Sequence, residues 1–528
     1  MRKVVFLSRI NQEESDLMKS RNVYVFSNSF HFMLKIGSLL LGAVFYAWTI
    51  HFINNINKYN TSFDSLIFAF SWIGIGILVF VIITWYITTR NLFSPYIIFW
   101  VFFFIFNFGQ SFMWAFGIHL PDEIGKGTIS GLQPFSQSTV LKTQIYTCLC
   151  MFCFHLGALF CYKPQKRIST SDINDRNLDI TYNAMWIVGC ILGAISIIPT
   201  MYRALNFFVV ASQYGYKAIY YSDHASQGGV TMILEMFFLP SLVFLLIGSK
   251  YNKKVRYVVY TIFIIYLGIN LLSGDRGSWI YKLLVFIWLH SQFVKSISAK
   301  KLIKYIVIVL FFVYSLSVIT AFRNIGLENL NITNVIEIMF EGESPITQAF
   351  FEMGESMSIL SALLLSSNLD AYWDYGNTYL TALLGVVSTR TLSILQVPFV
   401  LVDNWFSQDY LGISWGAGFS MIGEAYLNGG MYFAPIIMLV LGMTIGSVLY
   451  IDIKLIPKNH PIRFAFVAVS LGIVIGLSRS TVYLFFKTWF YGIAVPSILI
   501  YLLIQFHNRK KNLSRSNLSQ HKQINKSI

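Results

Sequence analysis

Long uncharged apolar stretches recur along this chain from about residue 31 to residue 506, and they constrain its fold more than any other feature. Each approaches the roughly 20 residues that an α-helix needs to cross a bilayer. Charged residues make up only 12% of the 528 residues, about half the usual share in soluble proteins. A soluble enzyme and a disordered chain are therefore excluded. The stretches are too continuous for a membrane β-barrel, so we predict an all-α polytopic membrane protein.

The apolar stretches divide into about twelve predicted transmembrane helices. A polar break at Gly274–Gly277 separates two of them and predicts a tight turn. The sequence contains no phosphate-binding loop motif and no evident internal repeat, so nothing indicates an ATP-driven transporter or a carrier built from two similar halves. The predicted spans are 31–53, 64–88, 93–117, 141–162, 182–202, 230–249, 255–273, 277–296, 302–321, 429–450, 461–478 and 483–506.

The distribution of Lys and Arg between short loops predicts the orientation of these spans. Basic residues gather in the N-terminal segment, in alternate short loops and in the tail, and all of these fall on one side of the membrane. Both termini are therefore predicted to be cytoplasmic, and no cleavable signal peptide is apparent. The chain then divides into a cytoplasmic segment 1–30, helices one to nine in 31–321, a large outer loop 322–428, helices ten to twelve in 429–506 and a basic cytoplasmic tail 507–528.

The large outer loop differs in charge from the rest of the chain. Residues 322–428 contain eleven acidic and two basic residues, a net charge of −9, although the whole chain carries +15. The basic character therefore reflects cytoplasmic anchoring and does not indicate a nucleic-acid partner. Within the loop, 346–366 and 376–402 are apolar enough to form interfacial or re-entrant helices packed on the bundle. A pair of extra spans within 346–402 would preserve the orientation and stays open.

A set of cations breaks the orientation rule, because it lies on the predicted outer side. Arginine forms two parallel hydrogen bonds to phosphate oxygens, so such a cluster suits an anion that carries two phosphates. The alternative is that each arginine pairs with an acidic residue of the loop. The predicted diphosphate ligands are Arg276, Arg479, Arg323, Arg203, Arg390 and Lys487.

Carboxylates on the same side are candidates for a general base, which must accept a proton from an attacking hydroxyl. Glu424 is the first choice, because a helix through its Gly-rich segment would place Ser420 and Asn428 on the same face. Glu352 and Glu355 are the second choice, and the remaining loop acids are interpreted as solvated. Asp275 beside Arg276 is a further catalytic candidate. Tyr426, Asn428 and Trp373 are weaker candidates for glycan contacts, since aromatic residues also form the interfacial belt of membrane proteins.

In the order of these segments the chain resembles the Wzy family of O-antigen and capsule repeat-unit polymerases. The resemblance covers most of the chain, and the large late outer loop is part of it. It implies a membrane-embedded glycosyltransferase with a GT-C-like fold that needs no metal or other cofactor. The segments that carry it are Gly274-Asp275-Arg276-Gly277, the Gly418–Gly429 stretch with Ser420, Glu424, Tyr426 and Asn428, and Arg479-Ser480-Thr481 leading into Phe485-Phe486-Lys487.

The resemblance also implies the substrates and the location. The donor would be a glycan chain on undecaprenyl diphosphate, and the acceptor a repeat unit on a second such lipid. The reaction would invert the anomeric centre on the periplasmic face of the bacterial inner membrane, during lipopolysaccharide or capsule synthesis. Chain-length regulator and flippase proteins would be further partners. A flippase or other transporter of lipid-linked oligosaccharide and an O-antigen ligase are the alternatives. A flippase is disfavoured because polar residues collect on one side of the spans and do not line a path through them.

Overall fold

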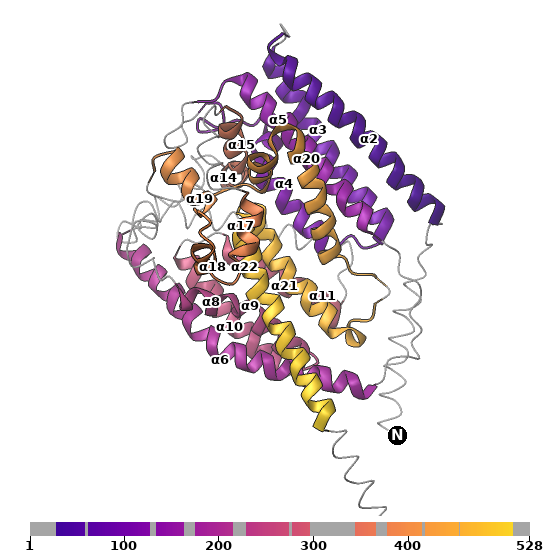
Figure 1. Cartoon of the computed structure of the whole chain (residues 1–528), viewed down its shortest axis with the longest axis vertical. Helices are drawn as coiled ribbons and strands as arrows, with labels where there is room; N and C mark the ends of the chain where they lie inside the picture. Colours follow the sequence, from indigo (N-terminus) through magenta and orange to yellow (C-terminus); the bar gives the residue numbers. More distant parts are fainter. Residues whose placement is uncertain are drawn as a thin grey trace, which may run out of the picture.

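The computed structural model describes residues 28–58, 62–126, 134–162, 175–214, 229–273, 277–295, 344–365, 377–413, 418–453 and 455–510. Within these ranges the chain is built from helices and contains no strand, as predicted (Figure 1). The helices that form the bundle are α2 (Asn28–Asn55), α3 (Phe63–Thr89), α4 (Pro95–Trp114), α5 (Gln137–Cys161), α6 (Asp175–Tyr214), α8 (Val230–Met236), α9 (Phe238–Gly248), α10 (Lys253–Leu272), α11 (Ser278–Phe293), α20 (Met421–Leu449), α21 (Pro461–Leu477) and α22 (Val482–Trp489), the last of which continues through η7 (Phe490–Ala494).

Nine of the described helical segments are long and apolar enough to cross a membrane. This confirms a polytopic all-α membrane protein. Two further predicted spans correspond to shorter helices, α11 with 16 residues and α21 with 17. The span predicted at 302–321 lies outside the described residues, so the total of twelve stays a prediction.

Helices α4 and α5 occupy the centre of the bundle, whereas α2 and α3 lie on its outside. The apolar residues that α2 exposes, such as Leu40 and Val44, suit a surface covered by lipid. The two central helices also contain polar side chains, which cannot face hydrocarbon without a partner. Gln144 of α5, for example, donates to the Ser71 hydroxyl of α3 at 2.8 Å. Polar side chains inside predicted spans therefore mark the faces that point into the bundle.

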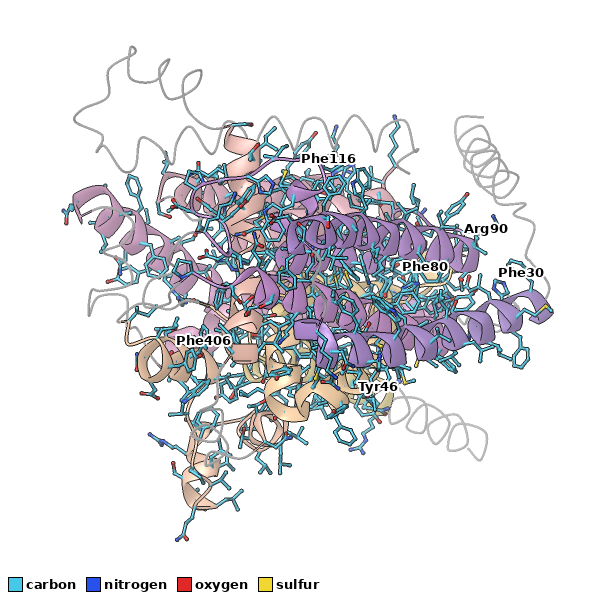
Figure 2. All side chains as sticks on the ribbon, turned by 90° about the horizontal axis from the view of Figure 1, so that it is seen from above. Phe30, Tyr46, Phe80, Arg90, Phe116 and Phe406 are labelled. Atoms are coloured by element: carbon cyan, nitrogen blue, oxygen red, sulfur yellow. The ribbon has the colours of Figure 1, made fainter. Side chains whose placement is uncertain are left out.

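The ends of the helices separate by charge. Lys35, Arg90, Lys250 and Arg463 lie at one end, which we call the basic end. Asp64, Glu123, Glu355 and Glu424 lie at the opposite end, which we call the acidic end. Figure 2 shows Phe30 and Arg90 toward the first end and Phe116 and Phe406 toward the second. The alternation of helix starts and ends follows the up-and-down order expected from the Lys and Arg pattern.

Short helices cover the acidic end. They are α14 (Pro345–Gly354), α15 (Ser356–Leu365), α19 (Val402–Asn404) and η5 (Trp405–Tyr410), whereas α17 (Thr378–Leu384) begins at this end, packs against α22 and leads into α18 (Thr389–Ile394). In Figure 1, α14, α15, α17 and α19 gather beside the start of α20. A buried apolar cluster, which includes Met113, Met357 and Phe406, joins this cap to the ends of the long helices.

Helix α20 begins at Met421, eight residues before the predicted start of the tenth span at 429. It contains a kink at Gly430, whose φ of 57° suits glycine. Pro435 lies four residues after Met431 and has no N–H to donate to the Met431 carbonyl. The Tyr146 hydroxyl of α5 takes this role, with Oη 2.9 Å from the Met431 oxygen and 3.1 Å from the Gly430 oxygen. The kink therefore separates a short segment at the acidic end from the longer part of α20.

Candidate active site

Glu424 lies where α20, α17 and α22 begin, and its side chain is completely buried. One carboxylate oxygen accepts a hydrogen bond from the Thr378 hydroxyl at 2.7 Å. The other accepts from the Val482 N–H, also at 2.7 Å. A buried carboxylate is stable only when its oxygens are occupied in this way. Glu424 therefore fastens α17 and α22 to the start of α20, and it does not face solvent.

The two polar neighbours predicted to share a face with Glu424 continue the same network. Asn428 donates from Nδ2 to the Thr378 hydroxyl oxygen at 2.7 Å, and its Oδ1 accepts from the Thr378 N–H at 2.9 Å. Ser420 caps α20 by accepting from the Gly423 N–H, and its hydroxyl donates to Asn107 Oδ1 at 2.9 Å. The sequence spacing was thus informative, but the shared face points into protein and not into an open cavity.

Tyr426, the third residue of this segment, packs differently. Its ring meets that of Tyr146 edge to face, with centroids 5.7 Å apart, and it is half-buried. Its ring therefore packs against α5.

Arg479 lies in the turn between α21 and α22, three residues before Val482. Its side chain is exposed, and it makes no hydrogen bond or ion pair with any residue in the described ranges. Glu424 fixes the start of α22 through Val482 and so determines where this turn lies. The turn therefore holds a guanidinium group that is available to an anion.

Glu355 lies at the junction of α14 and α15 and is half-buried. Burial raises the pKa of Glu355 above the ordinary 4.5 of a glutamate, and the negative charge of Glu352 raises it further. The positive charge of Arg479 acts in the opposite direction and lowers this pKa. Glu355 therefore lies within electrostatic reach of one other predicted carboxylate and of one predicted arginine.

Helix α14 approaches α4 closely enough to fix the position of these carboxylates. A Cβ atom added at Gly354 would lie 2.4 Å from the Gln110 backbone nitrogen, so only glycine fits there. The Gln110 side chain donates from Nε2 to the Phe351 carbonyl at 3.0 Å. Residues Glu352 and Glu355 are therefore supported by the central helix α4. Sequence reasoning missed Gln110, although a polar residue within an otherwise apolar span was a usable signal.

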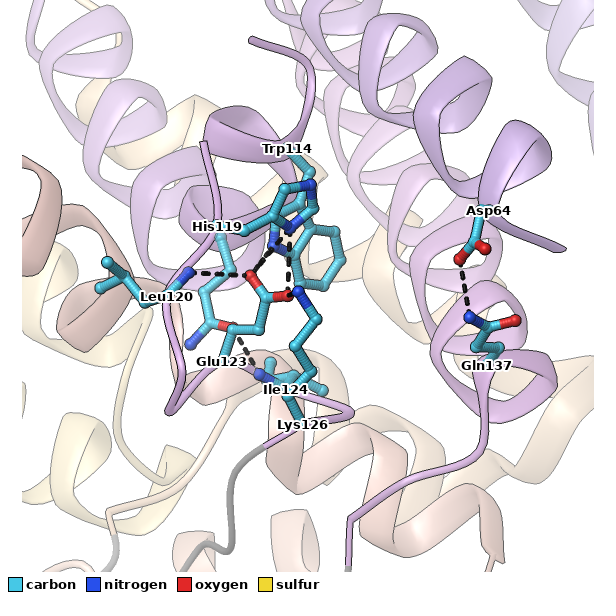
Figure 3. Close-up of polar contacts among 9 residues, drawn as sticks. Asp64, Trp114, His119, Leu120, Glu123, Ile124, Lys126 and Gln137 are labelled. Atoms are coloured by element: carbon cyan, nitrogen blue, oxygen red, sulfur yellow. Dashed lines mark hydrogen bonds and ion pairs between the residues drawn. The ribbon is translucent and has the colours of Figure 1, made fainter. Parts of the chain in front are cut away.

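A second carboxylate network, also missed, fastens the loop that follows α4 (Figure 3). Glu123 is buried and accepts from Trp114 Nε1 at 2.8 Å. Its carboxylate lies 3.0 Å from His119 Nδ1 and 2.6 Å from Lys126 Nζ. The next residue, Ile124, donates its N–H to Gln110 Oε1 at 2.9 Å. This loop therefore buttresses Gln110 and, through it, α14.

The other predicted cations are not drawn into this site by any described contact. Arg203 forms an ion pair with Glu235 of α8 and lies over the Phe207 ring at 5.0 Å. Arg390 is exposed on α18, and Lys487 lies on α22 with Nζ 5.6 Å from the Tyr483 ring centre. The predicted residues Asp275, Arg276, Arg323 and Trp373 lie outside the described residues.

The described part of the site offers a cation for an anionic group and a carboxylate that can accept a proton. Within the same ranges, no group of three or more His, Cys, Asp or Glu side chains is arranged to hold a metal ion. Cys150 and Cys153 of α5 are buried free thiols, and they pack there as small apolar side chains.

Comparison with known families gives one match. The model of a family described as O-antigen polysaccharide polymerase Wzy matches residues 44–511. This range includes every residue of the site described above. No curated protein sequence and no solved structure matches the chain.

Proposed function

Because this chain belongs to the O-antigen polysaccharide polymerase Wzy family, we propose that it transfers a growing glycan from one undecaprenyl diphosphate to a lipid-linked repeat unit on another. The family is a glycosyltransferase-type polymerase that acts on lipid-linked oligosaccharide repeat units in membranes. The proposal specifies two lipid carriers, and it specifies that the growing glycan moves onto the new repeat unit. The product is lengthened O-antigen or capsule glycan.

The acidic end is proposed to be the outer, periplasmic end of the bundle in the bacterial inner membrane. The support is the gathering of Lys35, Arg90, Lys250 and Arg463 at the opposite end, since cytoplasmic ends of spans carry the excess of Lys and Arg. Both termini are then cytoplasmic. Chain-length regulator and flippase proteins would meet the enzyme in the same membrane.

The observation that carries the proposal is an exposed arginine, Arg479, whose charge acts on the half-buried Glu355 at the acidic end. Glu355 accepts the proton of the attacking sugar hydroxyl, and that oxygen forms a bond to the anomeric carbon of the donor. The bond from this carbon to the diphosphate oxygen breaks, and the lipid diphosphate leaves as an anion. Arg479 stabilises its charge. A single displacement of this kind inverts the anomeric centre.

Glu355 is proposed as the base in preference to Glu424 for a geometric reason. A base must lie within hydrogen-bond reach of the proton that it removes. Both oxygens of Glu424 are occupied by protein donors and its side chain is completely buried, whereas Glu355 is partly exposed. Glu424 is instead a positioning residue for the Arg479 turn, and Glu352 is the second candidate base.

No cofactor enters this mechanism. A lipid diphosphate is already a stable leaving group, so it requires charge stabilisation more than protonation, and guanidinium groups supply this. Arg276 and Arg323 are proposed as further diphosphate ligands, Asp275 as a further acidic group and Trp373 as a glycan contact, from the sequence alone.

The deciding experiment is the surface glycan made by a host that lacks this protein. A polymerase defect leaves a single repeat unit on the surface, and a plasmid copy of the gene restores the ladder of longer chains. The variant Arg479→Ala should restore fewer and shorter chains than the unsubstituted protein at equal protein level. Loss of all surface glycan in the deletion host would contradict a polymerase and point to a flippase or a ligase.

A further inference from the structure

Helices α17 and α18 form a hairpin, residues 378–395, that exposes several large apolar side chains. Leu380, Leu383 and Val387 are each more than half exposed, and Ile394 is 79% exposed. Neither helix is long enough to span a bilayer, because α17 has seven residues and α18 has six. An exposed apolar surface of this kind marks a site of contact with lipid or protein.

Contacts with α22 show how deeply this hairpin descends. Its first residue, Thr378, lies level with Val482 at the start of α22, because both donate to Glu424. Nine residues after Val482, in η7, the Tyr491 hydroxyl donates to the Val387 carbonyl at 2.7 Å. At about 1.5 Å per helical residue, Tyr491 lies roughly 13 Å from Val482 along the helix axis, so the hairpin descends beside this helix, away from the acidic end. Val482–Lys510 is long and apolar enough to cross a membrane, so the hairpin lies beside a candidate span.

The chain then returns toward the acidic end. Phe399 lies against Tyr483, one residue after Val482, with ring centroids 5.0 Å apart. Asn377 and Ser388 cap the two short helices by accepting backbone N–H bonds, which satisfies donors that hydrocarbon could not. These caps allow the hairpin to lie against lipid chains beside the candidate active site.

Two cations accompany the apolar face. Lys487 lies between Tyr483 and Tyr491 on the face of α22 that packs against the hairpin. Arg390 is exposed on α18, three residues beyond Val387. Cations at membrane depth are unfavourable against hydrocarbon alone and suit an anionic group brought by a ligand. An apolar face with two cations therefore matches a lipid with an anionic headgroup.

We propose that the exposed face of the 378–395 hairpin docks the polyprenyl chain of a lipid-linked repeat unit, with Lys487, whose Nζ lies 5.6 Å from the Tyr483 ring centre, beside its diphosphate. This inference rests on the proposed function for the identity of the lipid. The substrate is favoured over bulk anionic phospholipid because the hairpin begins at Thr378, which is hydrogen-bonded to Glu424 beside the Arg479 turn. A lipid that docks here enters the site from the side, through the outer leaflet.

Photocrosslinking tests the docking directly. Ile394 is replaced by the photoreactive amino acid benzoylphenylalanine in the full-length protein, reconstituted in phosphatidylglycerol-containing nanodiscs with radiolabelled undecaprenyl diphosphate. The matched control is the same replacement at Ile198, which is 74% exposed on α6. We expect labelling at position 394 at least tenfold above position 198, abolished by excess unlabelled undecaprenyl diphosphate. Equal labelling at both positions, or competition by phosphatidylglycerol alone, would overturn the proposal.

Chain length gives a second test with a kinetic readout. Ile394→Asn should lower kcat/KM at least fivefold for a substrate on a full-length polyprenyl chain, and less than twofold for one on a two-isoprene chain. Ile198→Asn should leave both values unchanged. An equal loss with both substrates, or no loss with either, would refute docking of the chain. Failure of the unsubstituted protein to polymerise either substrate would refute the proposed function, while crosslinking would still decide whether the hairpin docks the lipid.

Discussion

The two ends of the bundle use cations in different ways. At the basic end, Lys35 donates to the carbonyl of Tyr162 at 2.6 Å, just after the last turn of α5. Arg463 donates in the same way to the carbonyl of Tyr450 at 2.5 Å, just after the last turn of α20. At the acidic end, Arg479 has no such carbonyl or carboxylate partner among the described residues.

This difference shows that position and partner decide the role of a cation more than residue type does. Carbonyl groups at a helix C-terminus carry partial negative charge and lack intrahelical donors, so Lys35 and Arg463 complete the structure of two helices. Arg479 completes no helix, and its guanidinium group is available to a ligand. A cation that is predicted to bind a ligand must therefore be checked for partners within the protein. Arg203 was predicted as such a cation, but it forms an ion pair with Glu235.

The strongest test of the comparison asks whether its two ends lie on opposite sides of the membrane. Gln408→Cys at the acidic end should react with an impermeant thiol reagent in intact cells, because Gln408 is exposed. Lys254→Cys at the basic end should react only after lysis. Gln408 is preferred to its neighbour Ser407, which is buried. Labelling of position 408 only after lysis would reverse the orientation and remove the basis for an outer active site.

The next largest effect separates two carboxylates of the acidic end. Glu355→Gln should reduce polymerisation by about 10²- to 10⁴-fold, because it removes the general base and preserves the shape. Glu424→Gln should retain far more activity, because its amide can still accept from Val482 N–H. Both are measured as the rate of chain extension in membranes with equal protein content. The reverse order of activities would identify Glu424 as the base.

The third prediction compares arginines from the two ends. Arg479→Ala should lower kcat/KM roughly ten- to a hundredfold, which corresponds to the loss of one charge-assisted contact of about 1.5–3 kcal/mol. Arg479→Lys should recover only part of this loss, since lysine keeps the charge but not the planar fork. Arg463→Ala is the matched control and should leave kcat/KM within about twofold of the starting value. Equal losses of kcat/KM in the two alanine variants would show that Arg479 contributes no more to the reaction than a cation at the basic end.

The same two alanine substitutions should rank in the opposite order when the stability of the fold is measured. Arg463→Ala leaves the carbonyl groups of Ser447 and Tyr450 without their charged donor and should destabilise the fold by about 1–2 kcal/mol. Arg479→Ala should leave the unfolding temperature unchanged. Thermal unfolding in detergent, followed by circular dichroism, measures both. A loss of stability in Arg479→Ala would indicate a structural partner for this side chain.

The smallest expected effect is a shift in the pH dependence of kcat/KM. A base must be deprotonated, so the rate falls as the pH drops through its pKa. Because the pKa of Glu355 is raised by burial and by Glu352, its acid limb should lie above that of an ordinary glutamate. Glu352→Gln should move the limb to lower pH, and Arg479→Ala should move it to higher pH. Shifts of the same sign would mean that another group controls the profile.

Most of the architecture followed from the sequence, because a bilayer imposes length and charge rules that can be read without knowing any contact. The regular spacing from Ser420 to Asn428 likewise followed from helical periodicity. The burial of Glu424 did not, since its partners lie 46 and 58 residues away along the chain. Nor could the sequence show that α14 meets α4 at Gln110, because that contact spans 241 residues.

The kink at Gly430 has a consequence for how the enzyme tolerates different membranes. The bilayer acts mainly on the longer, apolar part of α20 beyond the kink, whereas Ser420–Gly429 is held by hydrogen bonds to Asn107, Thr378 and Val482. A span adapts to a thicker or thinner bilayer mainly by tilting. With the Tyr146 hydroxyl bridging the break, we expect the lower part of α20 to tilt together with α5, on which it packs closely at Gly442 and Gly446, while Glu424 stays in register with its partners. A mismatch between the span and the bilayer thickness would then change the angle at Gly430 and leave the position of Glu424 unchanged.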